Sequence, residues 1–255
     1  MKYLFPSKVK YFNVRIASRT KAICHKMPRD IKPIKLYGGY LGPNPFKTHI
    51  ILLELDLPYE IEFIDFSQVK TPAYESVNPN GRLPAIYDPN TDLTLWESGA
   101  IIEYLIETYD QDHKISFARG TKESYHTRQW LYYQVSGQGP YYGQAVWFKR
   151  YHEDHIESAI QRYVNEMKRV SKVLDRWLEN REWLVGDKLT YADLAFIPWQ
   201  NAAQDFLSGE GFDQDEFPHV RNWLNRMNER PVVKYLAEKQ KQAMRERMPQ
   251  ARTEK

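Results

Sequence analysis

The sequence is poor in cysteine, and it lacks any long uncharged apolar run. Its 255 residues include one cysteine, Cys24, which excludes an intramolecular disulfide and any paired-cysteine redox or zinc motif. No stretch of about 18 apolar residues occurs, so no hydrophobic membrane-spanning helix is expected. With 42% hydrophobic residues, the chain is still long enough for one large domain or two of ordinary size.

An excess of positive charge is also absent outside the first 33 residues. Residues 1–33 hold nine Lys or Arg against one acid, Asp30, which makes +8. Since the whole chain carries +3, residues 34–255 carry −5. This body has no basic stripe that would follow a phosphate backbone, so nucleic acid is not expected as a partner. His152 and His155 lie in YHEDHIES, which is typical of an exposed segment, and no metal is expected.

Residues 1–33 are expected to form an appendage to the folded body. They are basic, and apolar residues such as Val9, Phe12 and Ile16 could share one helical face, as in a mitochondrial presequence. An inert leader, or a chain that starts at Met27, fits the same composition. We therefore expect a cytoplasmic protein, with mitochondrial import through this segment as the alternative.

The pattern from 34 to 112 is that of a small mixed domain. A strand begins at Ile34, and a helix starts within GPNPFK. Further strands are predicted in PYEIEFIDF and, as a hairpin, in LPAIYD and LTLW, before an amphipathic helix in ESGAIIEYLIETYD. One short helix is expected in the polar stretch between them. This order favours a sheet with helices on its faces.

After a polar connection at 111–124, the pattern is helical throughout. Residues 120–240 contain several amphipathic stretches, of which AIQRYVNEMKRVSKVLDRWLEN is the clearest. Glycine and proline at 138–143 interrupt one of them. Residues 241–255 form a charged tail that is expected to fray. The sequence thus predicts an all-helical domain after the mixed domain at 34–112.

A capping box is expected within the helical domain. Thr190 and Asp193 have the spacing of such a box, with Asp in place of the usual Glu or Gln. Leu189 and Leu194 flank them at the positions of a hydrophobic staple. We expect this motif to serve folding and not chemistry.

The turn before the first helix carries the first candidate site residue, Asn44. Asn44 occupies the expected N-cap and Pro45 the first helical position, where a missing N–H costs nothing. Free backbone N–H groups and the positive end of the helix dipole gather at such a terminus, and they favour an anion such as a thiolate. A simple helix cap is the competing interpretation.

Three further features of this domain point to a small peptide ligand. Pro84 opens a strand, and a cis Leu83–Pro84 bond would turn the backbone groups of Leu83 toward an extended peptide. Ser98 at a helix start could hold a carboxylate, and Glu97 could hold an ammonium. Arg82 is free to meet a second carboxylate. Each feature alone has a structural explanation, but in this order they describe a site for a zwitterionic peptide.

The chain resembles the cytosolic-type glutathione transferases over about residues 34–236. The motifs that carry the resemblance are SVNPNGRLPAI, LWESGAIIEYL, YYQVSGQGPYYGQA and LVGDKLTYADLAF. They are most similar to the fungal branch related to the yeast nitrogen-catabolite regulator and to the bacterial nu class. The resemblance implies a thioredoxin-like N-terminal domain, an all-helical C-terminal domain, glutathione as co-substrate and a homodimer.

The resemblance also implies roles for individual residues. Members of this branch place an asparagine at the position of Asn44, where other classes use Tyr, Ser or Cys. Five positions fall on the family's glutathione contacts: Arg82, Leu83, Glu97, Ser98 and Arg162. Two positions differ from the family pattern, since Gly42 stands where the nu class has Thr and Val69 where the fungal branch often has His.

An apolar pocket for a second substrate is expected above Asn44. Most rings of the aromatic run at 130–151 should belong to the core. Tyr141, Tyr142 and Trp147 are the candidates for lining the pocket.

The hypothesis from the sequence is a glutathione-dependent enzyme without a covalent protein nucleophile. Glutathione supplies the sulfur, and Asn44 with its helix terminus lowers the pKa of the thiol. The thiolate would conjugate electrophiles or reduce disulfides and peroxides. A glutathione-binding regulatory protein with little turnover and a conjugating step in a biosynthetic pathway are the alternatives. The regulator is disfavoured because residues 1–33 contain one asparagine, Asn13, and no glutamine.

Overall fold

The computed structural model describes residues 31–207 and 211–247. The predicted leader therefore lies outside the described residues except for its last three positions. The first half of the chain contains β1 (Ile34–Gly38), α1 (Pro43–Glu54), β2 (Tyr59–Phe63), α2 (Pro72–Glu75), β3 (Ala85–Asp88), β4 (Leu93–Trp96) and α3 (Ser98–Tyr109). The predicted order of strands and helices is confirmed.

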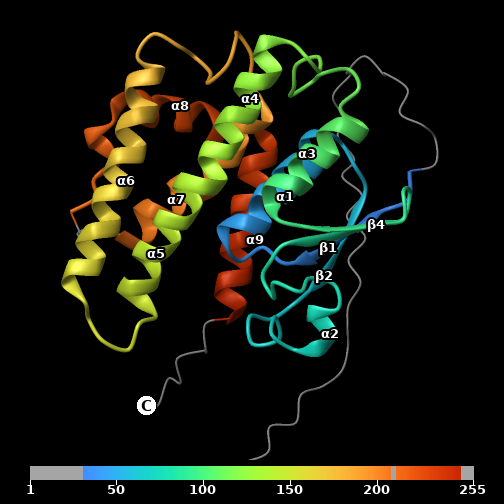
Figure 1. The fold of residues 1–255 in the computed structure, drawn as a ribbon, viewed down its shortest axis with the longest axis horizontal. Coiled ribbons are helices and arrows are strands. Elements are labelled where there is room, and N and C mark those ends of the chain that lie inside the picture. The colour runs from blue at the N-terminus through green and yellow to red at the C-terminus, as the bar shows by residue number, and fades with distance from the viewer. Residues whose placement is uncertain (1–30, 208–210, 248–255) are drawn as a thin grey trace, which may run out of the picture.

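The second half is helical, as predicted. It consists of α4 (Lys122–Tyr133), a π-helical turn η1 (Gln134–Gln138), α5 (Gly139–Arg150), α6 (Glu157–Leu178), α7 (Tyr191–Leu207), a 3-10 turn η2 (Gln214–Glu216), α8 (Pro218–Asn228) and α9 (Pro231–Arg247). In Figure 1 these helices, coloured from green to red, stand beside the sheet domain. Helix α9 extends seven residues into the segment that was expected to be a charged tail.

The four strands form one mixed sheet in the order β2-β1-β3-β4. β1 pairs in parallel with β2, which requires the crossover that α1 supplies. β1 also pairs with β3 in antiparallel fashion, and β3 and β4 form the predicted hairpin. Leu36 and Ile86 face each other across β1 and β3 and are fully buried.

The helical domain is built around α6 and α7. The buried side chains of α6 recur every three or four residues, as expected for an amphipathic helix: Ile160, Val164, Met167, Val170, Leu174 and Leu178. Helix α6 packs on α5 and α8. None of the helices in the described part of the chain is both long and apolar enough to cross a bilayer.

The predicted capping box is present at the start of α7. The buried carboxylate of Asp193 accepts hydrogen bonds from the backbone N–H of Thr190 at 2.9 Å and from its hydroxyl at 2.7 Å. The second carboxylate oxygen accepts from the backbone N–H of Leu184 and the indole N–H of Trp223. Burial raises the pKa of Asp193, and these donors act in the opposite direction. The box thus ties three segments of the helical domain together.

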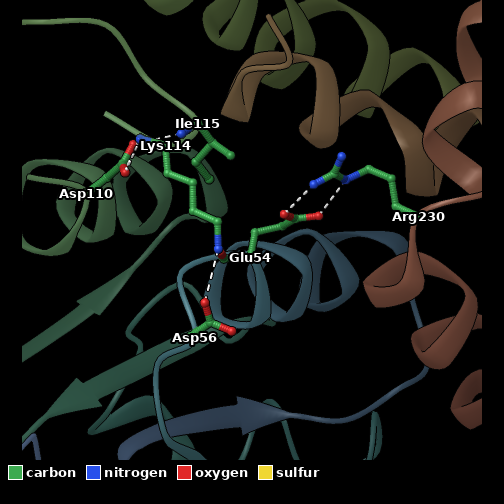
Figure 2. A network of polar contacts seen from close by, with 6 residues as sticks. All are labelled: Glu54, Asp56, Asp110, Lys114, Ile115 and Arg230. Carbon is green, nitrogen blue, oxygen red and sulfur yellow. Dashed lines mark hydrogen bonds and ion pairs between the residues drawn. The ribbon is translucent and has the colours of Figure 1, made fainter. Parts of the chain in front are cut away.

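The two domains meet along α1, which contacts α3 on one side and α7 and α9 on the other. Figure 2 shows the C-terminal end of this contact. The carboxylate of Glu54 is 3% exposed and binds the guanidinium of Arg230 through two hydrogen bonds of 2.7 Å. Lys114, from the connection between the domains, donates to the backbone carbonyl of Glu54 at 2.5 Å and to Asp56 at 3.0 Å. The connection itself is held by Asp110, which accepts from the backbone N–H groups that follow it.

Candidate functional site

Helix α1 begins at Pro43, two residues earlier than the sequence suggested. Gly42 is the N-cap, Asn44 is the second helical residue and Pro45 is the third. The prediction that Asn44 is the N-cap is therefore wrong. Pro43 already has a φ angle suited to the first turn, and Gly42 adopts φ 89°, which favours glycine. Asn44 remains in the first turn, and because Pro43 and Pro45 have no backbone N–H, it supplies the N–H group among these three residues.

The side-chain amide of Asn44 is held by the helical domain. Its oxygen accepts a hydrogen bond of 3.0 Å from the indole nitrogen of Trp199 on α7. An indole N–H can only donate, so the contact fixes which end of the amide faces Trp199. The NH₂ group of Asn44 is then the end that can donate to an anion placed at the start of α1.

Two glycines on α5 make room for the Trp199 ring. A Cβ atom on Gly143 would lie 3.3 Å from Cη2 of Trp199, and one on Gly139 would lie 3.5 Å from its indole nitrogen. Both glycines belong to the segment 138–143, which was expected to interrupt a helix. The structure instead places a π-helical turn at η1 and continues the helix through these glycines. Their small size permits the close approach of α7.

Lys47 lies one turn after Asn44 and is 2% exposed. Its ammonium nitrogen donates to the side-chain oxygen of Gln134 at 2.8 Å. Gln134 donates in turn to Gln138 at 2.9 Å, and Gln138 donates to the backbone oxygen of Phe196. Burial lowers the pKa of Lys47 to about 7, and the charge of Glu97 opposes this shift. The π-turn brings the two glutamines into contact beneath the site, which fits the frequent use of such turns at functional sites.

The start of α3 packs against the same π-turn. Glu97 is the N-cap of α3, with φ 71°, and Ser98 is its first residue and is buried. A Cβ atom on Gly99 would lie 3.0 Å from Cγ1 of Val135 in η1. The N-termini of α1 and α3 therefore converge on η1, so the positive ends of two helices border one site.

The loop before β3 is held next to Glu97. Asn80 donates from its side chain to the Glu97 carboxylate at 3.3 Å. The backbone oxygen of Arg82 accepts from Tyr74 at 2.9 Å and from Asn78 at 2.6 Å. These bonds leave the guanidinium of Arg82 on the exposed side of the loop.

The backbone of Leu83 lies just before β3, an inner strand of the sheet. The Leu83–Pro84 bond is cis, as expected, and Leu83 stands just outside β3, which begins at Ala85. Val69, one of the positions that differs from the family pattern, packs its backbone oxygen against Gly81, where a Cβ atom would approach it to 2.6 Å. Gly81 is thus required for the path of this loop.

Arg162 makes no described contact with these residues. It stands on an exposed face of α6, with 61% of its side chain accessible, and pairs with Glu166. Within residues 31–207 and 211–247, no hydrogen bond or ion pair joins it to the residues around Asn44. Its predicted contact with glutathione stays a prediction.

The three aromatic candidates for the second pocket lie in different environments. Tyr142 is fully buried, and its hydroxyl is 2.9 Å from that of Ser171, so its assignment to an open pocket is wrong. The residue faces the core because α5 turns this side toward α6 and α7. Tyr141 is half-buried under the guanidinium of Arg169, and Trp147 is 51% exposed beside Tyr151.

The structure also identifies residues that the sequence did not single out, namely Lys47, Gln134 and Trp199. Lys47 gave a usable signal, because it is a lone lysine within an apolar helix. The other two are polar groups whose partners lie about 90 and 150 residues away in the sequence. Among the residues that the structure describes, no group of three or more His, Cys, Asp or Glu side chains is arranged to hold a metal ion.

A small mixed sheet domain joined to a helical domain is the architecture of a glutathione transferase. The family model for the N-terminal domain of glutathione S-transferases matches residues 32–107, and the model for their C-terminal domain matches residues 142–231. The chain belongs to the glutathione S-transferase family.

Individual relatives are similar over most of their length. The glutathione S-transferase-like protein gedE of Aspergillus terreus is 56% identical over 211 residues, covering 79% of this chain and 93% of its own. The solved glutathione transferase URE2P8 of Phanerochaete chrysosporium, with oxidized glutathione, is 41% identical with a TM-score of 0.80, and the match covers 86% of this chain and 99% of that one. Ure2p5 of the same fungus, cocrystallized with 1-(S-glutathionyl)-2,4-dinitrobenzene, is 36% identical with a TM-score of 0.76, over 86% and 98% of the two chains.

Proposed function

We propose that the protein binds glutathione where α1, α3 and η1 converge and that it activates the glutathione thiol for attack on a second substrate. The observation that carries this proposal is the hydrogen bond from Trp199 to the oxygen of Asn44, which leaves the amide NH₂ group as the donor at the helix start. A donor of this kind stabilises a thiolate more than a thiol.

The remaining contacts define how glutathione would lie. Ser98 and the start of α3 hold the carboxylate of the γ-glutamyl end, and Glu97 holds its ammonium. The backbone of the peptide runs along Leu83, just before β3. Arg82 meets the glycine carboxylate. Arg162 approaches from the helical domain after a change of side-chain rotamer that releases Glu166.

The chemistry needs no covalent bond to the protein. Lowering the thiol pKa from about 8.5 to about 6.5 would stabilise the thiolate by roughly 2.7 kcal/mol. At neutral pH the thiolate then becomes the major form. It attacks an electrophilic carbon, which loses a leaving group such as halide, to give a thioether. Alternatively it attacks a disulfide sulfur, whose partner sulfur leaves as a thiolate, to give a mixed disulfide. Two solved relatives, one with oxidized glutathione and one with a dinitrobenzene conjugate of glutathione, support both classes of second substrate.

Turnover with purified protein tests this function. A panel of aromatic halides, isothiocyanates, peroxides and glutathione mixed disulfides should contain at least one substrate that is consumed with glutathione. Asn44→Ala should lose most of that activity. Tight glutathione binding without turnover on any member of the panel would favour the regulatory alternative and would contradict the proposed enzyme.

We also propose that the protein is a homodimer. Large aromatic side chains stand exposed on β4 and α4, which both contact α3: Trp96, Tyr125 and Tyr132. A face of this kind is suited to contact with a second copy. Light scattering should give about twice the chain mass of 30.3 kDa, and Tyr125→Glu should shift the mass toward the monomer. A mass of one chain at micromolar concentration would contradict the dimer.

The cytoplasm is the location we propose for the protein. A fluorescent fusion of the full chain should remain in the cytoplasm, and a fusion that starts at Met27 should behave in the same way. Mitochondrial import of the full chain alone would show that residues 1–33 act as a presequence.

A further inference from the structure

Lys47 is enclosed more completely than any other lysine or arginine among the described residues. Its side chain is 2% exposed. By contrast, Arg230 and Arg128 pair with acidic groups at helix contacts, and 34% of each of their side chains stays accessible. Burial of an ammonium lowers stability unless an anion compensates its charge. The groups around Lys47 therefore indicate whether its role is structural or functional.

No anion lies within hydrogen-bond distance of the Lys47 nitrogen among the residues that the structure describes. Its partner is the neutral amide oxygen of Gln134 at 2.8 Å. Glu97, at the start of α3, is the charged group that acts on it from a neighbouring element, and Glu97 is itself exposed. On α1, His49 faces away from Lys47, toward Gly39 and Tyr59. The charge of Lys47 is thus only partly compensated within the protein.

Lys47 lies close to the predicted place of the glutathione sulfur. It is three residues after Asn44, on the same side of α1. The partners of these two residues are neighbours as well. A Cβ atom on Gly139 would lie 3.5 Å from the indole nitrogen of Trp199 and 3.8 Å from the side-chain nitrogen of Gln134. We therefore expect an anion at the start of α1 to lie near both the Asn44 amide and the Lys47 nitrogen.

We infer that Lys47 takes up the proton that the glutathione thiol loses in the complex, an inference that rests on the proposed glutathione site. The S–H bond breaks, the electron pair stays on sulfur, and the proton is bound by the Lys47 amine to give an ammonium. The protein then holds a thiolate and an ammonium in place of a thiol and an amine. No proton needs to leave the complex.

The state of Lys47 in the free protein agrees with this role. Burial lowers its pKa to about 7, so the amine is available at slightly alkaline pH. An incoming thiolate supplies the missing anion and raises the affinity of Lys47 for a proton. By linkage, the ammonium lowers the thiol pKa to the same extent.

The proton balance of glutathione binding tests the inference. It is measured by calorimetry at pH 7.5 in buffers of different ionisation enthalpy, while absorbance near about 240 nm reports the thiolate. In the wild-type protein, thiolate should form with release of roughly 0.2 proton per site or less. S-methylglutathione, which has no thiol proton, should bind with no thiolate signal and almost no proton exchange.

Two variants should disrupt the proposed proton transfer from the thiol to Lys47 in different ways. In Lys47→Met, thiolate either no longer forms at pH 7.5 or forms with release of most of a proton. In Gln134→Glu, an anion keeps Lys47 protonated before glutathione arrives, so each thiolate formed should release close to one proton. Lys172→Met, which removes an exposed lysine from α6, should retain the wild-type balance.

Full proton release by the wild-type protein, or a wild-type balance in both Lys47→Met and Gln134→Glu, would overturn the role of Lys47. These results would leave the glutathione site intact. Absence of glutathione binding or of any thiolate in the wild-type protein would instead contradict the proposed function itself.

Discussion

Both ends of α1 are anchored to the helical domain, and each carries a buried charge, but only one of these charges has an ionic partner. At the C-terminal end, the buried carboxylate of Glu54 is paired with Arg230 through two hydrogen bonds (Figure 2). At the N-terminal end, the buried ammonium of Lys47 has a neutral amide as its partner, and Asn44 is held by a neutral indole. The charge at the C-terminal end is compensated by an ion pair, which we call the complete end. The charge at the N-terminal end, the incomplete end, lacks an anionic partner among the described residues.

This difference separates a structural contact from a functional one. A buried charge with a full set of partners fixes how two elements lie, and it gains little from any further ligand. A buried charge that lacks its counter-ion lowers stability until a ligand supplies one. We therefore expect removal of a charge to change the free energy of unfolding in opposite directions at the two ends: a decrease at the domain contact and an increase at the site.

The largest effect is expected at the complete end. Arg230→Met leaves the Glu54 carboxylate buried without its partner, and it should lower the free energy of unfolding by about 3–5 kcal/mol. Chemical denaturation measures this loss. Arg221→Met, which breaks an exposed pair with Asp215, should cost less than about 1 kcal/mol. A similar small loss for both variants would mean that Arg230 does not hold the domains together.

At the incomplete end, removal of the charge should stabilise the protein. The pKa of Lys47 is about 7 in the folded chain against an ordinary value of 10.5. The unfolded chain thus binds more protons between these values, and this residue makes stability rise with pH across that window. Lys47→Met should raise the free energy of unfolding by about 1–4 kcal/mol at pH 7 and below, and by progressively less toward pH 10.5.

The contradictory result would be a loss of stability in Lys47→Met at pH 7. Such a loss would show that Lys47 is a well-compensated structural residue. Thermal unfolding of the wild type and the variant at pH 6, 7, 8, 9 and 10 supplies the comparison, with Lys172→Met as a control whose stability should follow the wild type.

The ligand anchors should show an intermediate effect. Ser98→Ala and Glu97→Gln should each weaken glutathione binding by about 1–3 kcal/mol, because each leaves a charged group of the ligand without a partner. Isothermal calorimetry measures the affinity. If both variants bind as tightly as the wild type, the ends of glutathione lie elsewhere.

A smaller effect is expected at Trp199, which only positions Asn44. Trp199→Phe keeps the ring but removes the N–H, and it should raise the thiol pKa of bound glutathione by less than about one unit, with a lower kcat and little change in KM. Trp223→Phe is the matched control, since its indole also donates a 3.0 Å bond, to Asp193. That control should lower stability and leave the thiol pKa unchanged, whereas equal pKa shifts in both would remove the special role of Trp199.

The elements themselves could be predicted because they depend on local patterns. Alternation and turn residues marked the hairpin that ends in Trp96, and the three-to-four spacing of apolar residues marked α6. The capping box at Thr190 was found because its two members lie three residues apart. Patterns of this length are visible in a single sequence.

Contacts between the domains could not be predicted in this way. The partners of Asn44 and Lys47 lie on α7 and η1, and no local rule connects such distant positions. The start of α1 was misplaced by two residues because two prolines flank Asn44, and either one suits a first turn. Tyr142 was misassigned because an aromatic residue in a helix gives no sign of which neighbour it will face.

The central claim is that Asn44 lowers the thiol pKa of bound glutathione, and a titration of the thiolate tests it most directly. Absorbance near about 240 nm is followed against pH for glutathione bound to the wild type, Asn44→Ala and Asn44→Ser. The account predicts a thiol pKa of about 6.5 for glutathione bound to the wild type. In Asn44→Ala this pKa should rise by about one unit or more, and turnover at pH 7 should fall several-fold. Identical titration curves for all three proteins would contradict it, because the thiol would then be activated without the Asn44 amide.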